Sequence, residues 1–239
     1  MTAINTNVGA LNARLYAMNA NNSQDKAMER LSSGLRINSA ADDAAGLAVA
    51  GKMESQLRGI GMSIRNNQDG IGLIQTAESG LNEVRNMVLR IRELAVQMAN
   101  GIYENTPDRD NAQLEVAALL AQVNLISDNT RFNDVAVIDG SFTGVTIQAG
   151  NTTAETITLS FLDSGASTLN IVSSTVATQS DAKVAIGQMD SALETIAGEQ
   201  ATMGSLVNRL EFSISNQTRA SVMTEQALGR IMDADFAAE

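Results

Sequence analysis

Carboxylates are the side chains of this sequence that could carry out acid–base or metal chemistry, because the chain contains no histidine and no cysteine. They cluster most closely at Asp42–Asp43, at Asp108–Asp110 and at Asp233–Asp235. The first two clusters lie at predicted helix starts, where negative charge is favourable, and the third lies near a predicted helix end. The spacing of Asp108 and Asp110 matches no complete calcium loop. The sequence therefore predicts no catalytic residue, no metal site and no cofactor, and we expect the protein not to be an enzyme.

The residue types that are missing or scarce exclude further classes of function. Without cysteine, histidine or tryptophan, the chain lacks thiol nucleophiles, zinc ligands, haem ligands and Ser-His-Asp triads. The formal net charge of -11 argues against a nucleic-acid partner. No stretch approaches the roughly 20 apolar residues of a membrane-spanning helix, and the N-terminus lacks a signal-peptide pattern. We therefore expect neither membrane insertion nor classical export.

The elements that would position these side chains are predicted to be mainly long helices. Val8, Leu11 and Leu15 form the apolar stripe of a first helix, and a connector with Asn38 and Ser39 follows it. A second helix from Asp43 to Asn100 carries apolar residues spaced alternately four and three apart, which is a heptad pattern. Its seam contains Met53, Leu57, Ile60, Ile64, Asn67, Ile71, Ile74, Glu78 and Leu81, and after a one-residue shift it continues through Val84, Val88, Ile91, Ala95 and Met98.

A third helix and a hairpin are predicted in the middle of the chain. Thr106, Pro107 and Asp108 have the order of a helix start, and we assign the buried face of this helix to Leu114, Ala117, Ala121 and Leu125. Between residues 135 and 177 the period changes to two. Apolar residues there alternate with polar ones on both sides of Gly150-Asn151, which predicts a β-hairpin.

The last segment returns to the heptad pattern, with Ser180 as the predicted N-cap. Its seam contains Ile186, Met189, Leu193, Ile196, Gln200, Met203, Val207, Leu210, Ile214, Gln217, Ser221, Thr224, Leu228 and Ile231. Two such helices can bury their seams against each other or against copies of themselves. We predict a mainly α fold: a long antiparallel heptad-patterned helical rod with a small β-hairpin insert. The polar seam residues Asn67, Glu78, Gln200 and Gln217 either fix the register of this packing or face solvent at its edge.

Several sequence runs resemble the bacterial flagellins. The N-terminal signature of that family is similar to residues 31–46, LSSGLRINSAADDAAG, and the resemblance continues through residues 65–71, 78–83 and 90–97. Residues 131–133, RFN, fit the family's turn into its hairpin. Residues 204–210 and 230–239 resemble the family's C-terminal helix and its ending.

The resemblance implies a structural subunit that polymerises into the flagellar filament for motility. It implies four segments: an inner-core helix with its connector at 1–42, rod parts at 43–140 and 180–239, and a short variable hairpin region at 141–179. The rod-packing seam would include Leu57, Ile60, Ile64, Ile71, Ile74, Leu193, Ile196, Val207, Leu210 and Ile214.

The resemblance also implies a location and partners. The chain would be secreted to the extracellular flagellum without a cleaved signal peptide, through the type III flagellar export apparatus and with a flagellin chaperone. In the filament it would contact copies of itself, the filament cap and hook-associated proteins.

Flagellins usually continue beyond the stretch that matches the end of this chain with one more helix, whereas this sequence stops at Glu239. We therefore expect a truncated chain, in which the apolar stripe from Ile4 to Leu35 is exposed or pairs with a neighbouring chain. Such a truncation would weaken filament assembly and remove much of the segment that the chaperone binds.

Innate immune recognition is a further implication of the resemblance. A Toll-like receptor senses some flagellins that carry an Arg-x-Arg-Glu-Leu-Ala-Val-Gln run, which is present here at residues 90–97. Arg90 and Leu94 lie one helical turn apart on one face, and Glu115 matches the third contact. The alternative is that Arg90 is a solvated charge and Leu94 a contact between subunits.

Two other functions remain open from the sequence. The hook-filament junction protein shares the design of the terminal helices, although the runs at residues 31–46 and 90–97 favour flagellin. A flagellin-like surface adhesin that uses residues 141–179 is the second alternative.

Overall fold

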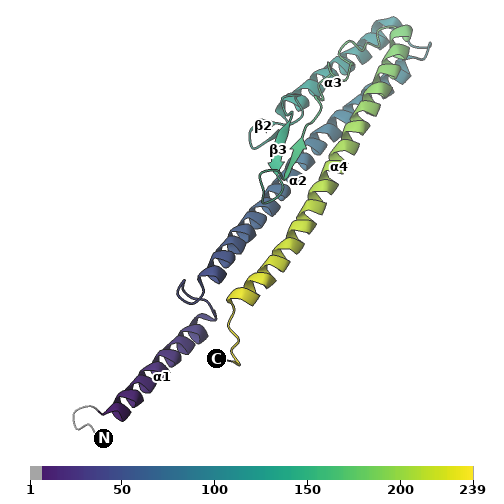
Figure 1. The fold of residues 1–239 in the computed structure, drawn as a ribbon. Helices are drawn as coiled ribbons and strands as arrows, with labels where there is room; N and C mark the ends of the chain where they lie inside the picture. The colour runs from purple at the N-terminus through teal and green to yellow at the C-terminus, as the bar shows by residue number, and fades with distance from the viewer. Residues whose placement is uncertain (1–6, 239) are drawn as a thin grey trace. The chain divides into compact units, whose positions relative to one another are not determined.

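A computed structural model describes residues 7–238 of the chain (Figure 1). Ile4 and Glu239, which limit the predicted N-terminal stripe and the predicted truncation, lie outside these residues. The expected mainly α fold with a small hairpin is confirmed. The elements are α1 (Val8–Ser33), α2 (Ala44–Met98), η1 (Asn105–Arg109), α3 (Asp110–Asn129), β1 (Arg131–Phe132), β2 (Val135–Ala136), β3 (Val145–Gln148), β4 (Thr156–Leu159) and α4 (Gln179–Met232).

The chain divides into two units. One comprises the described residues before position 62 together with those after position 217, and we call it the terminal unit. The other, residues 62–217, is the central unit. The central unit contains most of α2 and α4, with η1, α3 and all four strands.

Within the central unit, α2 and α4 run antiparallel. Nε of Arg92 on α2 lies 2.6 Å from Oδ1 of Asp190 on α4. Twenty-five residues earlier on α2, Nδ2 of Asn67 donates to Oγ of Ser213, which lies twenty-three residues later on α4. The two helices therefore keep nearly one register over this length, as the shared heptad pattern predicts.

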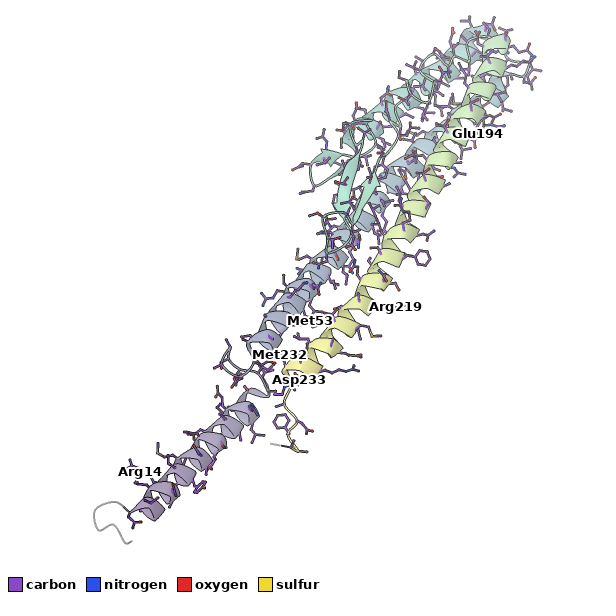
Figure 2. The ribbon with its side chains drawn as sticks, viewed as in Figure 1. Arg14, Met53, Glu194, Arg219, Met232 and Asp233 are labelled. Carbon is purple, nitrogen blue, oxygen red and sulfur yellow. The ribbon has the colours of Figure 1, made fainter. Side chains whose placement is uncertain are left out.

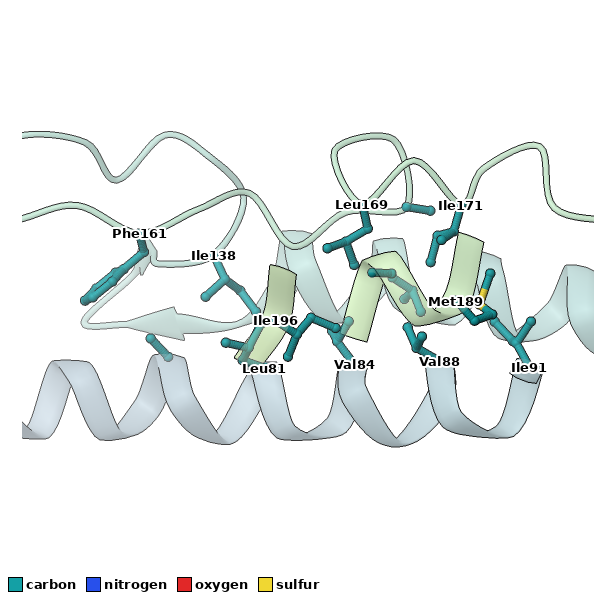
Figure 3. Packing of buried hydrophobic residues seen from close by; sticks show 14 of the residues in the cluster. Leu81, Val84, Val88, Ile91, Ile138, Phe161, Leu169, Ile171, Met189 and Ile196 are labelled. Carbon is teal, nitrogen blue, oxygen red and sulfur yellow. The ribbon is translucent and has the colours of Figure 1, made fainter. Parts of the chain in front are cut away.

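The core of the central unit lies between these two helices, α3 and the loops that follow it (Figure 3). Its largest fully buried side chains are aliphatic, and burial of each contributes about 1.5–3 kcal/mol. These include Ile74, Leu81, Val84, Val88 and Ile91 of α2, Met189, Ile196, Met203 and Leu210 of α4, and Ile138, Leu159 and Ile171 of the strands and loops.

The predicted buried face of α3 is wrong. Leu114 and Leu125 are exposed, as are Ala117 and Ala121, and the opposite face is buried instead. Both faces are apolar, so periodicity alone could not distinguish them. The face with the larger apolar volume packs into the core, because burial free energy grows with the apolar area removed from water. The buried residues are Val116, Leu120, Val123 and Ser127.

Two details of the long helices also differ from the prediction. Glu78 does not occupy the buried seam and is exposed. The N-cap of α4 is Thr178 rather than Ser180, since Oγ1 of Thr178 accepts from the backbone N–H of Asp181 at 3.1 Å and donates to its carboxylate at 2.6 Å. Reciprocal bonds of this kind satisfy a free N–H at the helix start, and Ser180 falls inside the first turn.

The predicted hairpin is confirmed: β3 and β4 pair antiparallel, with Val145 opposite Leu159 and Gln148 opposite Thr156. Phe142 and Phe161 stack beside it with ring centroids 5.1 Å apart. A second small ladder, β1 with β2, was not predicted as a separate sheet. Its tight turn places Asn133 and Asp134 at φ 48° and 64°, a conformation that these residue types tolerate better than most.

The terminal unit is held together differently. α1 buries none of its residues, and it ends at Gly34, whose φ of 72° suits a glycine cap. The connector then binds the end of α4 through its backbone. The N–H of Arg36 donates to the carbonyl of Met232 at 2.6 Å, and the N–H of Ala234 donates to the carbonyl of Gly34 at 3.0 Å. Figure 2 labels Met232 and Asp233 at this end of α4.

Candidate functional site

The three residues predicted for receptor recognition lie close together in the central unit, with Arg90 and Glu115 at the surface and Leu94 in the buried core. Arg90 on α2 donates from Nε to Oε1 of Glu115 on α3 at 2.8 Å, and its Nη2 lies 2.8 Å from the same oxygen. Its Nη1 also donates to Glu93 at 3.3 Å. Leu94, one turn further along α2, is only 5% exposed. An arriving partner would therefore meet the ion pair before the leucine.

The ion pair borders an open groove of about 370 Å³. Besides Arg90, Leu94 and Glu115, the groove is lined by Gln97 and Tyr103, whose side chains share a hydrogen bond of 3.3 Å. The hydrogen bond that Arg90 donates to Glu115 raises the pKa of Arg90 further, and the guanidinium is charged throughout the physiological range. At this groove, the positive charge of Arg90 is therefore already paired with the carboxylate of Glu115.

A buried arginine that the sequence analysis missed positions α3 against α2. Arg109 is 3% exposed and donates from Nε to the carbonyl of Met98 at 3.1 Å and from Nη2 to that of Asn100 at 3.0 Å. Its Nη1 donates to the carbonyl of Tyr103 at 2.6 Å and to Oδ1 of Asn105 at 2.8 Å. The sequence signal that could have identified Arg109 is its place shortly after the end of a predicted helix, because basic side chains there bind the last carbonyl groups of the helix.

The predicted packing seam is placed at the inner faces of α2 and α4. Ile60, Ile74, Ile196 and Leu210 are buried. The other predicted seam residues, which lie at the edges of the same faces, are half-buried: Leu57, Ile64, Ile71, Leu193, Val207 and Ile214.

Among the polar seam residues, Asn67 is fully buried. Its Nδ2 donates to the carbonyl of Ala149 at 3.1 Å as well as to Ser213, while its Oδ1 has no hydrogen-bond partner in the described part of the chain. Gln200 is half-buried and donates to Oδ1 of Asn82 across the two helices at 2.8 Å. These contacts link α2 to α4 and to the end of β3, as expected of residues that fix register.

An uncovered apolar surface lies along α1. The side chains of Val8, Leu11, Leu15 and Met18 are each more than half exposed, although their spacing places them on one face. A contiguous apolar face of this kind is uncommon on a monomeric protein and marks an interaction surface. We therefore regard it as a binding surface in its own right.

The carboxylates of Asp42 and Asp43 accept hydrogen bonds from nearby backbone N–H groups. Oδ2 of Asp42 accepts from the backbone N–H and the hydroxyl of Ser39, both at 3.0 Å, and Oδ1 of Asp43 accepts from the N–H of Gly46 at 2.8 Å. The hydroxyl of Ser39 is the main cause of a lowered pKa at Asp42. Within residues 7–238, no three acidic side chains gather as a metal site would require, and no helix is long and apolar enough to cross a membrane.

Comparison with known proteins identifies relatives over nearly the whole chain. Residues 4–143 match the bacterial flagellin N-terminal helical region, and residues 186–239 match the corresponding C-terminal helical region. A flagellin of Halalkalibacterium halodurans is 41% identical over 99% of this chain and 87% of its own length. A flagellin of Bacillus subtilis is 34% identical over 99% of this chain and 88% of its own. The crystal structure of Bacillus cereus flagellin has a TM-score of 0.58 at 30% identity, over 64% of this chain and 88% of that one.

Proposed function

Because the chain belongs to the bacterial flagellin family and is a structural subunit of the flagellar filament, we propose that neighbouring copies cover the apolar stripe of α1 when it polymerises. The exposure of that stripe carries the proposal. Fully burying an exposed valine, leucine or methionine side chain contributes about 1.5–3 kcal/mol. The four residues of the stripe are each just over half exposed, so covering them supplies roughly half of that per residue, which is still a substantial driving force for association. A subunit that covered this stripe by itself would lack that driving force.

The test places two charges on the stripe and compares them with two charges on the opposite face of α1. We expect Leu11→Asp/Leu15→Asp to abolish sedimentable filaments, whereas Ala13→Asp/Ala17→Asp, with the same charges and spacing, polymerises like the parent chain. Negative-stain microscopy and circular dichroism would accompany the sedimentation, so that unfolding is not mistaken for lost assembly. Filaments of normal yield from the Leu11/Leu15 variant would refute the proposal.

Export and capping partners follow from the same assignment. The protein belongs to a filament outside the cell. We infer that it reaches that place unfolded through the flagellar type III export apparatus, with a flagellin chaperone, and that it then meets the cap and hook-associated proteins. Secretion that persists in a strain without the flagellar export apparatus would contradict it.

Recognition by a Toll-like receptor is a second proposal, and the pairing of Arg90 with Glu115 beside the groove favours it. Arginine is enriched among the residues that carry most of the binding energy of protein interfaces, and Arg90 lies at this groove. We expect Arg90→Ala to reduce receptor signalling in reporter cells at least tenfold, while Arg85→Ala, an exposed arginine on the same helix, leaves it unchanged. Equal signalling by both variants would count against this site.

The two alternative functions are not favoured. Family models for both ends of the flagellin chain match this sequence, and relatives named flagellin align with nearly all of it. These matches therefore favour a filament subunit over a hook-filament junction protein or a surface adhesin.

A further inference from the structure

An exposed aromatic side chain stands out on α4 of the central unit. Phe212 is 77% exposed, whereas Phe142 and Phe161 of the same unit are buried against each other. Aromatic side chains remove a large apolar area from water when they are buried, and for this reason they are common anchors of protein interfaces. Because most of its ring is exposed, Phe212 contributes little apolar burial to the folding of its own subunit.

The same unit carries a groove of about 330 Å³ beside α2 and β3, lined by both apolar and polar residues. Leu73, Phe132 and Ile147 line it, and Gly70 and Asp69 of α2 also border it. A closed apolar cavity of about 150 Å³ is enough to hold a benzene molecule, so a phenyl ring fits within this space. Phe132 would offer such a ring an aromatic partner.

The aromatic side chain and the groove face in different directions. Leu210 points toward the groove side of α4, since a Cβ atom built on Gly70 would meet the side chain of Ile147 and lie 3.4 Å from Cδ1 of Leu210. Phe212 follows Leu210 by two residues, which rotates its side chain by about 200° around the helix. Phe212 therefore cannot enter the groove of its own subunit, but it can enter that of another.

Charges on the two surfaces are complementary. Arg209 precedes Phe212 by three residues, so both side chains lie on one face of α4. Asp69 lies at the groove and is exposed. Neither Arg209 nor Asp69 forms an ion pair with a described residue. An arginine beside the aromatic anchor and an aspartate beside the groove would attract each other across a contact between two copies.

We infer that Phe212 of one subunit inserts into the groove formed by Leu73, Phe132 and Ile147 of a second copy, with Arg209 facing Asp69. The inference rests on the assignment as a filament subunit and adds a contact separate from the α1 stripe. A contact between two different surfaces of one subunit is heterologous, and it generates an open helical polymer when the rotation between neighbouring copies does not close a ring.

The first test removes the aromatic side chain. Phe212→Ser is compared with Ile102→Ser, which deletes another large apolar side chain with the same exposure of 77%. Because both residues are exposed, both variants should keep the thermal unfolding of the parent. We expect Phe212→Ser alone to raise the critical concentration for polymerisation about tenfold, the factor that corresponds to losing about 1.4 kcal/mol of association free energy. Equal critical concentrations for the two variants would overturn the inference.

A second test reverses the charges. Arg209→Glu and Asp69→Arg should each raise the critical concentration, and the double variant should bring it back toward the parent value. Two single effects that simply add, without recovery in the double variant, would show that the two residues do not meet.

A third test uses the natural lack of cysteine. Copies carrying Phe212→Cys are mixed with copies carrying Thr146→Cys, a groove residue, and treated with a short bismaleimide. Cross-linked pairs between the two variants are expected, and their absence from sedimented material would contradict the inference. The Leu11→Asp/Leu15→Asp variant affects the α1 contact only, so the failure of one interface is distinguishable from the failure of the other.

Discussion

The central and terminal units differ in how many apolar side chains they bury. All members of the hydrophobic core lie between Ile74 and Leu210, within the central unit. Among the described residues of the terminal unit, the buried apolar side chains are Ile37, Ala50 and Ile60. The central unit therefore has the burial needed to fold alone, whereas the terminal unit exposes the surface that an assembly would cover. Folding thus draws mainly on the buried core of the central unit, whereas polymerisation draws on the exposed surfaces of both units.

The terminal unit relies on backbone contacts where the central unit relies on packing. The connector and the end of α4 exchange hydrogen bonds at Arg36 and Ala234, and Nη2 of Arg36 donates to the carbonyl of Ile231 at 2.7 Å. Solvent-exposed hydrogen bonds of this kind contribute less to stability than the burial of large side chains. We therefore expect the terminal unit to open at a lower free energy than the central unit.

The largest expected effect comes from placing a charge in the central core. Leu210→Asp should lower the free energy of unfolding by more than about 4 kcal/mol, because it buries an unpaired carboxylate. Phe212→Asp, two residues along the same helix, should change it by less than about 0.5 kcal/mol, because that position is exposed. Circular dichroism during urea unfolding would measure both, and similar losses for the two variants would undermine the assignment of the core.

A smaller loss is expected where α2 joins α3. Arg109→Met should destabilise the central unit by about 2–3 kcal/mol, because the substitution leaves buried carbonyl groups without donors. The Arg90–Glu115 pair should also loosen, since Arg109 fixes the start of α3. Arg92→Met, which removes an exposed ion pair instead, serves as the control for urea unfolding. A negligible effect of Arg109→Met would show that α3 is positioned by packing alone.

A pH-dependent effect is expected in the connector of the terminal unit. The hydrogen bonds from Ser39 lower the pKa of Asp42, so its carboxylate stabilises the folded connector at neutral pH. That stabilisation is present above the ordinary carboxyl pKa and is lost as the pH falls through the lowered value. Asp42→Asn should therefore be slightly less stable than the parent at pH 7 and nearly equal to it in acid. A difference that grows on acidification would contradict this sign.

The smallest effect on folding is expected in α1. Leu15→Ala should change the unfolding free energy of the chain by less than about 0.5 kcal/mol, because the side chain is already 57% exposed. Hydrogen exchange should show little protection of α1 in the unassembled subunit. Strong protection of the α1 amides would mean that the terminal unit is more stable, relative to the central unit, than its exposed side chains indicate.

The same contrast explains which parts of the fold were predictable from the sequence. The seams of α2 and α4 were predicted because each helix has one apolar face, and a single face determines what is buried. α3 has two apolar faces, and the choice between Leu114 and Val116 depends on the volume available in the completed core. Glu78 fits the seam by spacing alone, and its exposure reflects the high cost of burying a carboxylate.

The candidate site was predictable in part. Arg90, Leu94 and Glu115 were selected by resemblance, and the structure places them side by side. Arg109 was missed because its partners are carbonyl groups, and a carbonyl group is common to every residue type. Phe212 was missed because it lies off the heptad seam, and no spacing rule identifies an isolated aromatic residue on the polar face of a helix.

The antiparallel register of α2 and α4 has a consequence for the order of events during folding. Asn82 meets Gln200, and Arg92 meets Asp190, so the contacts that close the core join positions about a hundred residues apart. Local elements such as the β3–β4 hairpin can form early, but closing so long a loop carries an entropic cost before any core contact is gained. A nascent chain lacks the whole α4 side of this core, including Met189, Ile196 and Leu210, until α4 has been synthesised, and so the core stays open for most of translation.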